Sequence, residues 1–483
     1  MRNLRLQTRP FAFATVALVL LAAFGYCPPA KATDDDSLTD GSSDRPPPCQ
    51  PRPPIPPDPP IVVPPSPTTI DTIGQAYYCI FDNYVQGPIL SDRALLLPAF
   101  AGLTQELQRR GLDQPTATPP ALTGQRHRDW VAFRQVYLRI TQSLPADPAL
   151  AQAVAGATLQ AMVDALADDH ARWENTRSGG DQVGINLSIA RGPVNLDPAA
   201  VPPLFVIKVT ASSAAENAGV QVGDEILAIN GVPPFVNGVL SKGVIAWITN
   251  PTVGEPISLL LHRPITGTTL TVNIALSNRP PPAGPGGNVV KRLNNDIAYA
   301  VLGGFAVDPV NTLLQAVRDL GSTTPLRGLI LDMRGNGGGD TDAGAKLLGA
   351  FVHNATTGYW CDARHHCTAN RPDDSVPLLN LPLVVLIDRR CASACDAFSS
   401  AVKDLKFGTL VGTRTAGEVS GPADSYMLDD GSAISLPKYT QLEANREIVD
   451  TIGVAPDIYV PVTSADLSAG RDLPLAKAQE LLR

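Results

Sequence analysis

The sequence predicts an α/β core with parallel strands, preceded by an N-terminal helical region and a small β-rich domain. Three patterns lead to this fold class. Strands and helices alternate over residues 290–483, which is typical of a parallel sheet with helical crossovers. Short strands follow one another over residues 181–278. Apolar residues recur at three- and four-residue spacings over residues 70–180, which indicates amphipathic helices.

The first residues have the pattern of an export signal. A basic start with three arginines precedes an apolar run over residues 11–24, and Ala30-Lys31-Ala32 offers a small-residue cleavage site. The apolar run is too short for a comfortable transmembrane helix. We therefore predict a signal peptide over residues 1–32 and an exported protein, located in the periplasm or outside the cell.

Two proline-rich stretches are predicted to be linkers. Residues 46–67 carry 13 prolines, so residues 33–69 are expected to be a disordered, semi-rigid tether without a core of their own. Cys49 lies inside this tether and is a candidate to be pinned to the body through Cys79. A second linker is predicted over residues 279–289, between the β-rich domain and the α/β core.

Charge and cysteine content narrow the function. Lysine and arginine number 38 and acidic residues 46, so the net charge is 38 − 46 = −8, which argues against a nucleic-acid binder. Removal of Cys27 with the signal peptide leaves six cysteines, an even number that suggests disulfides in an exported chain. The spacing alone does not choose their pairing.

Two cysteine pairs invite specific interpretations. Cys361 and Cys367 enclose a loop with two histidines, which suggests either a disulfide-pinned loop or a metal site, and export favours the disulfide. His365 and His366 in this loop are secondary candidates for a base. Cys391 and Cys395 flank Ser393, and most simply tie that turn to the Cys361–Cys367 loop. A redox function of this pair is disfavoured because its spacing is not Cys-x-x-Cys.

Residues 391–396, Cys-Ala-Ser-Ala-Cys-Asp, are the strongest candidate for a catalytic nucleophile. They follow a buried-looking strand over residues 383–388 and precede a helical stretch over residues 397–405. At such a strand-to-helix turn, small neighbours leave the Ser393 hydroxyl accessible, and free N–H groups of the first helical turn can stabilise an oxyanion. A serine at this place can equally be a simple helix cap.

A glycine-rich loop follows another buried strand of the core. In Asp332-Met-Arg-Gly-Asn-Gly-Gly-Gly-Asp340 the glycines allow backbone N–H groups to face an anion or an oxyanion without obstruction. The spacing matches neither the P-loop nor the dinucleotide fingerprint, so we do not expect nucleotide binding. In a parallel sheet this loop and the Ser393 turn meet at the carboxyl ends of the strands.

The β-rich region resembles a PDZ domain. The resemblance rests on Ser213-Ala-Ala-Glu-Asn-Ala-Gly-Val-Gln-Val-Gly-Asp-Glu-Ile-Leu-Ala-Ile-Asn-Gly231. PDZ domains add an extended peptide as a strand at a sheet edge and hold its terminal carboxylate with backbone amides. The resemblance implies that the residues of the carboxylate-binding turn and strand contact a peptide here, namely Gly184, Ile185, Asn186 and Leu187. The module can also serve only for packing or gating.

The order of these parts resembles a family of serine proteases. The helical region, PDZ domain, glycine loop, serine turn and terminal Gly453-Val-Ala-Pro-Asp-Ile458 are similar to those of the tail-specific, or carboxyl-terminal-processing, proteases over residues 70–463. The resemblance implies a ClpP/crotonase-like, tricorn-type peptidase core that needs no metal or cofactor. It implies Ser393 as nucleophile, and it assigns supporting roles by position: oxyanion donors at Ala394, Gly338 and Gly339, and structural acids at Asp396 and Asp404.

The sequence departs from that family at the general base. The family's lysine stands 25 positions after the serine, and here that position holds Glu418, in Thr415-Ala-Gly-Glu418. A Ser–Lys dyad is therefore excluded at this site. Tricorn-like peptidases, which share the core, use a histidine that ends an upstream helix, and Asp169-His170 fits that place. We predict His170 as base, with Glu418 or Asp169 orienting its imidazole, although lysine-type relatives often carry a non-catalytic histidine in a similar segment.

Two functions follow from these residues. The first is an exported serine endopeptidase that cleaves polypeptides near their C-termini, with the PDZ domain presenting the end of the substrate. The second is an inactive relative that binds peptide C-termini as an adaptor or scaffold, which the loss of the lysine supports. The distance from a histidine Nε2 to Ser393 Oγ discriminates between them, because a base must lie within about 2.6–3.2 Å, or somewhat farther in an unliganded site.

Overall fold

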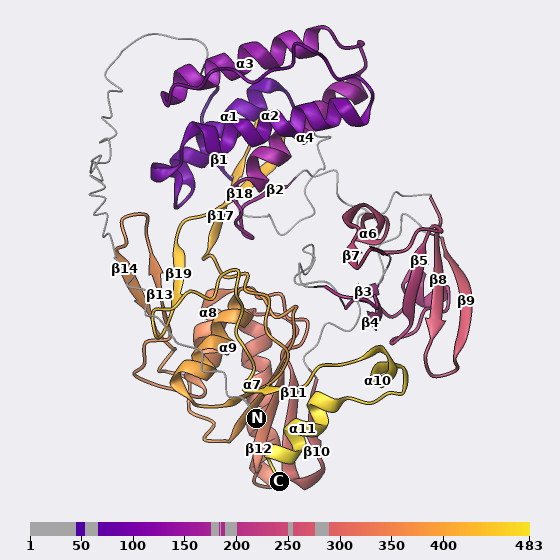
Figure 1. The fold of residues 1–483 in the computed structure, drawn as a ribbon. Coiled ribbons are helices and arrows are strands. Elements are labelled where there is room, and N and C mark those ends of the chain that lie inside the picture. The colour runs from indigo at the N-terminus through magenta and orange to yellow at the C-terminus, as the bar shows by residue number, and fades with distance from the viewer. Residues whose placement is uncertain are drawn as a thin grey trace, which may run out of the picture. The chain divides into compact units, whose positions relative to one another are not determined.

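The structure is a computed structural model, and it describes residues 45–53, 66–174, 183, 185–188, 200–249, 255–275 and 289–483 (Figure 1). The predicted signal peptide, most of the predicted tether, Gly184 and nearly all of the second linker lie outside the described residues. Among the helices that are described, none combines the length and the apolar character needed to cross a membrane.

Four helices form the N-terminal region, close to where the apolar periodicity predicts them. They are α1 (Ile70–Asn83), α2 (Asp92–Arg109), α3 (Arg126–Gln142) and α4 (Pro148–Asp164), with the short 3₁₀ helix η1 (Gly87–Ile89) after α1. Thr69, Ser91 and Asp147 cap the N-termini of α1, α2 and α4 with side-chain oxygens, as the sequence chemistry favours.

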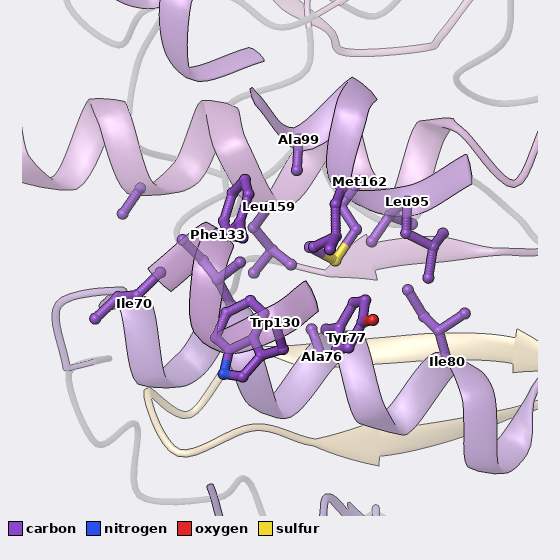
Figure 2. Packing of buried hydrophobic residues seen from close by; sticks show 14 of the residues in the cluster. Ile70, Ala76, Tyr77, Ile80, Leu95, Ala99, Trp130, Phe133, Leu159 and Met162 are labelled. Atoms are coloured by element: carbon purple, nitrogen blue, oxygen red, sulfur yellow. The ribbon is translucent and has the colours of Figure 1, made fainter. Parts of the chain in front are cut away.

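Aromatic and aliphatic side chains fill the core between these helices (Figure 2). Trp130 is buried and stacks between Tyr77 and Phe133, with ring centroids 5.3 and 5.7 Å apart. The same core includes Tyr426 and Ile434 from strands far along the chain. The helical region is therefore packed onto part of the C-terminal half through one continuous apolar cluster.

Those strands belong to a four-stranded antiparallel sheet in the order β1-β17-β18-β2. Its members are β1 (Gln50–Pro51), β2 (Arg172–Glu174), β17 (Ala423–Met427) and β18 (Ala433–Pro437). β2 follows His170 directly, so its pairing with β18 fixes where that histidine lies.

Residues 45–53 differ from the predicted tether. Gln50 and Pro51 pair with β17, Cys49 is disulfide-bonded to Cys79, and Arg45 contacts Asp82. Prolines prevent a central strand but are tolerated at a sheet edge, which is where β1 lies. Compositional reasoning missed this segment because its order comes from the disulfide and from a distant strand.

The PDZ region has a compact apolar core of its own, formed by residues between Val183 and Ile274. Its elements are β3 (Ile185–Leu187), β4 (Val206–Val209), α5 (Ala214–Asn217), β5 (Glu225–Ile229), β6 (Phe235–Val236), β7 (Val239–Leu240), α6 (Lys242–Thr249), β8 (Ile257–Arg263) and β9 (Thr268–Ile274). Asp224 is buried, and its carboxylate accepts hydrogen bonds from Arg263 of β8, which connects the turn before β5 to that strand.

A six-stranded sheet forms the centre of the C-terminal region, in the order β10-β11-β12-β15-β16-β20. Its strands are β10 (Val290–Leu293), β11 (Ile297–Val301), β12 (Gly328–Asp332), β15 (Leu383–Ile387), β16 (Thr409–Gly412) and β20 (Ile458–Tyr459). All neighbours from β11 onward pair in parallel, and β10 is antiparallel. This confirms the predicted α/β core.

Helices cover both faces of that sheet, which explains why its strands are continuously apolar. Alternate strand residues such as Leu331 and Val385 belong to one core cluster, and their neighbours Ile330 and Val384 belong to another. The helices of this region are α7 (Val307–Thr323), α8 (Thr341–Gly349), α9 (Ala394–Leu405), α10 (Ser464–Ser468) and α11 (Leu473–Leu481), with the 3₁₀ helix η2 (Asn294–Asp296) before β11.

A three-stranded antiparallel sheet was not predicted from the sequence. It consists of β13 (Gly358–Cys361), β14 (Cys367–Asn370) and β19 (Thr440–Glu443), in the order β14-β13-β19. Cys361 and Cys367 face each other in the β13–β14 register and are bonded to each other. Cys391 and Cys395 are likewise bonded to each other, so the interpretation that they tie the serine turn to the hairpin is wrong.

Candidate active site

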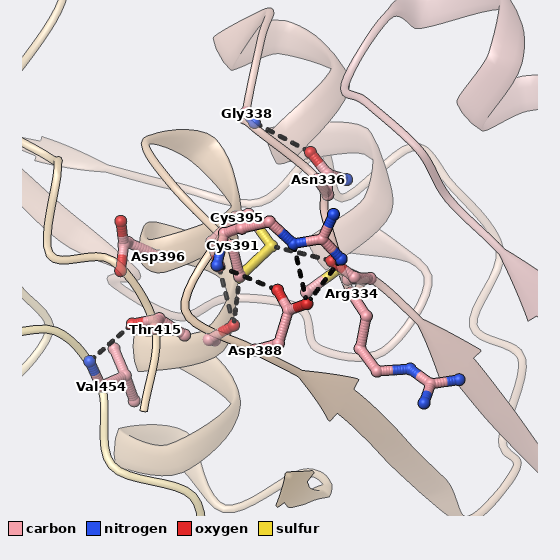
Figure 3. Close-up of a disulfide and its surroundings, with 12 residues drawn as sticks. Arg334, Asn336, Gly338, Asp388, Cys391, Cys395, Asp396, Thr415 and Val454 are labelled. Carbon is pink, nitrogen blue, oxygen red and sulfur yellow. Dashed lines mark hydrogen bonds and ion pairs between the residues drawn. A yellow bond between two sulfur atoms is a disulfide. The ribbon is translucent and has the colours of Figure 1, made fainter. Parts of the chain in front are cut away.

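The Ser393 turn connects β15 to α9 with an unusual backbone conformation. Ser393 precedes the first residue of α9 and has φ 56° and ψ −119°, outside the regions that residues with a Cβ prefer. Its N–H donates to Glu418 O at 2.8 Å and to Asp396 Oδ2 at 3.0 Å. The Cys391–Cys395 disulfide brackets the same turn (Figure 3). The strained conformation is thus fixed from several sides.

Asp396 joins this turn to the loop that contains Glu418. Its carboxylate accepts from the N–H groups of Gly417 and Glu418 at 3.0 and 3.1 Å, in addition to that of Ser393. The residue is fully buried, and burial raises the pKa of its carboxyl to about 7. Asp396 therefore lies where the family resemblance assigns a structural acid. Asp404, the second such residue, accepts from the backbone and side chain of Asn445 at 3.2 Å.

His170 lies beside the serine. Its Nε2 is 3.3 Å from Ser393 Oγ, although the two residues are 223 positions apart in the sequence. This distance is slightly beyond the range of about 2.6–3.2 Å for a working pair, as is common in unliganded sites. The structure thus brings together the two residues that the sequence analysis paired.

The second imidazole nitrogen contacts a residue that the sequence analysis did not name. Ser420 Oγ lies 3.0 Å from His170 Nδ1, and it donates to Asp168 Oδ1 at 2.7 Å. Because the hydroxyl hydrogen is used on the carboxylate, the oxygen accepts from Nδ1–H. The lone pair of Nε2 then faces Ser393, which is the tautomer a general base needs.

Both carboxylate oxygens of Asp168 accept further hydrogen bonds. Its Oδ1 accepts from the backbone N–H of His170 at 3.0 Å, and its Oδ2 accepts from Tyr84 OH on the segment after α1 at 3.0 Å. Asp168 and Ser420 therefore occupy the position beside the imidazole Nδ1 that we predicted for Asp169 or Glu418. Glu418 contributes its backbone to the serine turn, and its side chain is buried.

Two of the three predicted oxyanion donors line the cavity, and the third has its N–H engaged in another hydrogen bond. Ala394 and Gly339 line the cavity in front of Ser393. The N–H of Gly338 donates to Asn336 Oδ1 at 2.9 Å, so it is already engaged within the glycine loop (Figure 3). A role for Gly338 as donor would require that bond to break. Gly338 instead packs against the serine, since a Cβ added to it would lie 2.6 Å from Ser393 Cβ.

The cavity that contains Ser393 and His170 has a volume of about 590 Å³. Apolar and small side chains from α8 and α9 form one wall, including Leu348 and Phe398. Residues of β13 and β14, the loop before β17, and Arg172 complete it. A concave site with an apolar wall beside a nucleophile suits an extended polypeptide segment.

Comparison with known proteins agrees with this geometry. Residues 296–460 match the model of peptidase family S41, and residues 173–237 match the PDZ domain. The chain therefore contains a segment that matches peptidase family S41 and a segment that matches the PDZ domain. Both Ser393 and the glycine loop lie inside the S41 segment, whereas His170 lies upstream of it. The PDZ match ends before β8 and β9, which the structure places in the same apolar core.

Named relatives of this chain include the carboxyl-terminal-processing protease of Picosynechococcus, 27% identical over 74% of this chain and 84% of the relative. The chloroplastic C-terminal processing peptidase of Tetradesmus obliquus is 28% identical over 58% of this chain and 61% of that relative. A tricorn protease homolog of Streptomyces coelicolor is 34% identical, over 34% of this chain and 15% of its own length.

Solved structures share the fold of this chain. The photosystem II D1 C-terminal processing protease superposes with a TM-score of 0.50 and 20% identity, covering 81% of this chain and 93% of its own. Mature CPAF complexed with lactacystin gives a TM-score of 0.53 at 14% identity, with coverages of 86% and 97%. These matches confirm the predicted peptidase fold.

Other predicted site residues lie elsewhere. His365 and His366 are at the tip of the β13–β14 hairpin, where His366 contacts Asp362 and is largely exposed. Of the predicted peptide-binding residues, Gly184 is outside the described residues, and the backbone of Ile185–Leu187 pairs with β4. Within the described residues the other edge of β3 has no strand beside it, so a peptide-binding role stays a prediction.

A pH dependence of catalysis follows from the environment of His170. Burial lowers the pKa of its imidazole below 6.5, with Arg172 adding to that effect and Asp168 and Asp169 opposing it. A base acts in its neutral form, so a lowered pKa preserves activity toward acid. We expect the acid limb of kcat/KM to have its midpoint below pH 6.5, measured on a peptide without titratable groups.

A second carboxyl needs a control in that experiment. Burial raises the pKa of Asp450 to about 6, in the same pH range. Asp450→Asn should leave the acid limb near its original midpoint if His170 produces it. A limb that vanishes in Asp450→Asn, or a midpoint near 7, which is the pKa of the buried Asp396 carboxyl, would contradict the assignment to His170.

Proposed function

We propose that this chain is an exported serine endopeptidase that uses Ser393 as nucleophile and His170 as general base. The observation that carries the proposal is the chain of contacts Ser393–His170–Ser420–Asp168, at 3.3, 3.0 and 2.7 Å. It supplies a base with the right tautomer without the lysine that Glu418 replaces.

The steps of the reaction follow from this arrangement. Ser393 Oγ attacks the scissile carbonyl carbon while its proton passes to His170 Nε2. The oxygen that becomes negative is stabilised by backbone N–H groups at the N-terminus of α9 and in the glycine loop, with Ala394 and Gly339 as the proposed donors. The imidazolium then protonates the leaving amine, and water releases the acyl group by the reverse path.

The substrate is proposed to be a polypeptide cut near its C-terminus. Support comes from the PDZ match, from relatives named carboxyl-terminal-processing proteases, and from the open edge of β3 among the described residues. Export is proposed from the signal pattern in residues 1–32 together with three disulfides, which form in oxidising compartments. The contacts of His170 favour this reading over an inactive peptide-binding scaffold.

Covalent labelling tests the proposal directly. A fluorophosphonate probe reacts with an activated serine, so the native protein should be labelled and Ser393→Ala should not. The melting temperature of Ser393→Ala should equal that of the native protein, which shows that the loss of labelling is not caused by unfolding. A native protein that folds, yet takes up no label at pH 7.5, would overturn the peptidase proposal in favour of the scaffold.

A further inference from the structure

The cavity of the proposed active site is positively charged, although the chain as a whole has a net charge of −8. Besides His170, its charged lining residues are Arg172, Arg371 and Asp342, and all three are exposed. Within the part of the chain that the structure describes, neither arginine has an ion-pair partner. Two guanidinium groups thus face a peptide-sized cavity beside the nucleophile.

The nearest acidic residue on the same strand does not neutralise Arg172. Glu174 lies two positions further along β2, on the same face. Its carboxylate accepts from Arg52 at 2.8 Å and from Ser435 Oγ at 3.2 Å. Arg52 belongs to the N-terminal segment that the Cys49–Cys79 disulfide attaches to α1. Glu174 is therefore engaged elsewhere, which leaves Arg172 available to a ligand.

The position of Arg172 relative to the reaction can be assigned. It follows His170 by two residues, and both residues line the cavity that contains Ser393. The imidazole must pass its proton to the amine of the departing segment, so that segment leaves next to His170. Arg172 consequently lies on the side of the scissile bond that holds the C-terminal, departing part of the substrate.

We propose that Arg172, assisted by Arg371, forms a carboxylate-binding subsite for the departing segment of the substrate. Guanidinium groups bind carboxylates through paired, charge-assisted hydrogen bonds, which makes arginine the suitable residue type. The inference rests on the proposed function and narrows its substrates to polypeptides with a carboxylate shortly after the scissile bond. That carboxylate comes either from the chain terminus or from an aspartate or glutamate side chain.

Cleavage of a peptide mixture tests the subsite. Peptides from casein are digested with the native protein, and cleavage sites are mapped by mass spectrometry. Sites with a carboxylate within three residues on the departing side should be enriched roughly tenfold, the size of one charge-assisted hydrogen bond. Methyl esterification of the mixture should abolish the enrichment. Synthetic pairs that differ in a terminal acid or amide, or in Glu or Gln, separate the two sources of carboxylate.

Variants assign the effect to Arg172. Arg172→Gln should remove the enrichment, Arg172→Lys should retain part of it, and Arg371→Gln should reduce it. Arg139→Gln is the matched control, because it makes the same change in net charge at an exposed residue of α3 outside the cavity. Equal enrichment in Arg172→Gln and the native protein would overturn the subsite while leaving the peptidase function intact.

A binding measurement tests the carboxylate-binding subsite independently of the proposed peptidase activity. On Ser393→Ala, which cannot form the acyl-enzyme, fluorescence anisotropy compares an alanine-rich octapeptide as free acid and as amide. The free acid should bind roughly tenfold tighter, and Arg172→Gln should equalise the two. If the native protein cleaves nothing, the peptidase proposal fails and this comparison still decides the subsite. Equal binding of acid and amide would overturn it.

Discussion

Replacing His170 with alanine is expected to lower kcat by about 10²- to 10⁴-fold, the range that a positioned general base contributes. The reason is the 3.3 Å contact between Nε2 and Ser393 Oγ, in a site where no lysine stands at the family's position. KM should change little, because the imidazole acts on the proton of Ser393. Initial rates on one peptide substrate, at saturating and at low concentration, separate the two constants.

Glu418→Gln is the decisive companion to His170→Ala. The amide keeps the size of the side chain, and both backbone contacts of Glu418 to the serine turn remain. The imidazole is oriented by Ser420 and Asp168, so we expect kcat to stay within about tenfold of the native value. Thermal melts show whether loss of the buried carboxylate affects folding.

Ser420→Ala distinguishes the two candidate orienting groups further. It should lower kcat, because Nδ1 loses the acceptor that fixes the tautomer. If Glu418→Gln inactivates a folded enzyme while Ser420→Ala does not, then Glu418 orients the base and the Ser420–Asp168 path is wrong. A fully active His170→Ala variant would remove the histidine from the mechanism altogether.

The sequence was sufficient to predict those parts of the site whose residues lie close together in the chain. A buried strand followed by small residues and a helix predicted the Ser393 turn, whereas the place of His170 was predicted from the resemblance of its Asp-His segment to tricorn-like peptidases. Asp396 is three positions from the serine and completes the same turn. The Ser393 turn was predicted from its neighbours in the chain, where spacing and residue type are informative, and Asp396 and His170 were assigned by the family resemblance.

The orienting residues escaped prediction because they meet only through tertiary structure. Ser420 and His170 are 250 positions apart, and their contact depends on the pairing of β2 with β18 and on the loop after Glu418. One signal was present locally. Asp168 accepts from the N–H of His170 two residues later, which is the usual Asx-turn of an aspartate. That turn places the Asp168 carboxylate beside the backbone of His170.

The disulfide pairing was also only partly predictable from the sequence. The structure pairs Cys49 with Cys79 and Cys361 with Cys367, as the sequence suggested, but it pairs Cys391 with Cys395, which the sequence interpretation linked to the Cys361–Cys367 loop. Counting cysteines predicted oxidation but not partners, because partners depend on Cα separations that only the fold defines. The β1 segment was missed for an equivalent reason, since its ordering depends on Cys79 and on β17.

Gly338→Ala is expected to lower kcat/KM by about 100-fold or more while the protein still folds. Gly338 has φ +94°, which alanine rarely adopts, and an added Cβ would lie 2.6 Å from Ser393 Cβ and 2.7 Å from Ala392 O. The glycine loop and the serine turn must therefore separate. That movement displaces Ser393 from His170, and a misplacement of about 1 Å costs about this much in rate.

Gly303→Ala is the matched control for this change. Gly303 precedes Gly304, whose added Cβ would be 3.7 Å from Gly338 O, whereas a Cβ on Gly303 itself meets nothing within 4 Å. It should retain near-native kcat/KM, so a loss confined to Gly338→Ala isolates the contact with the serine. Fluorophosphonate labelling should slow in parallel with peptide cleavage, because both reactions need the same Ser393–His170 alignment. Native rates in a folded Gly338→Ala protein would mean that the close packing of glycine loop and serine turn is dispensable for activating the nucleophile.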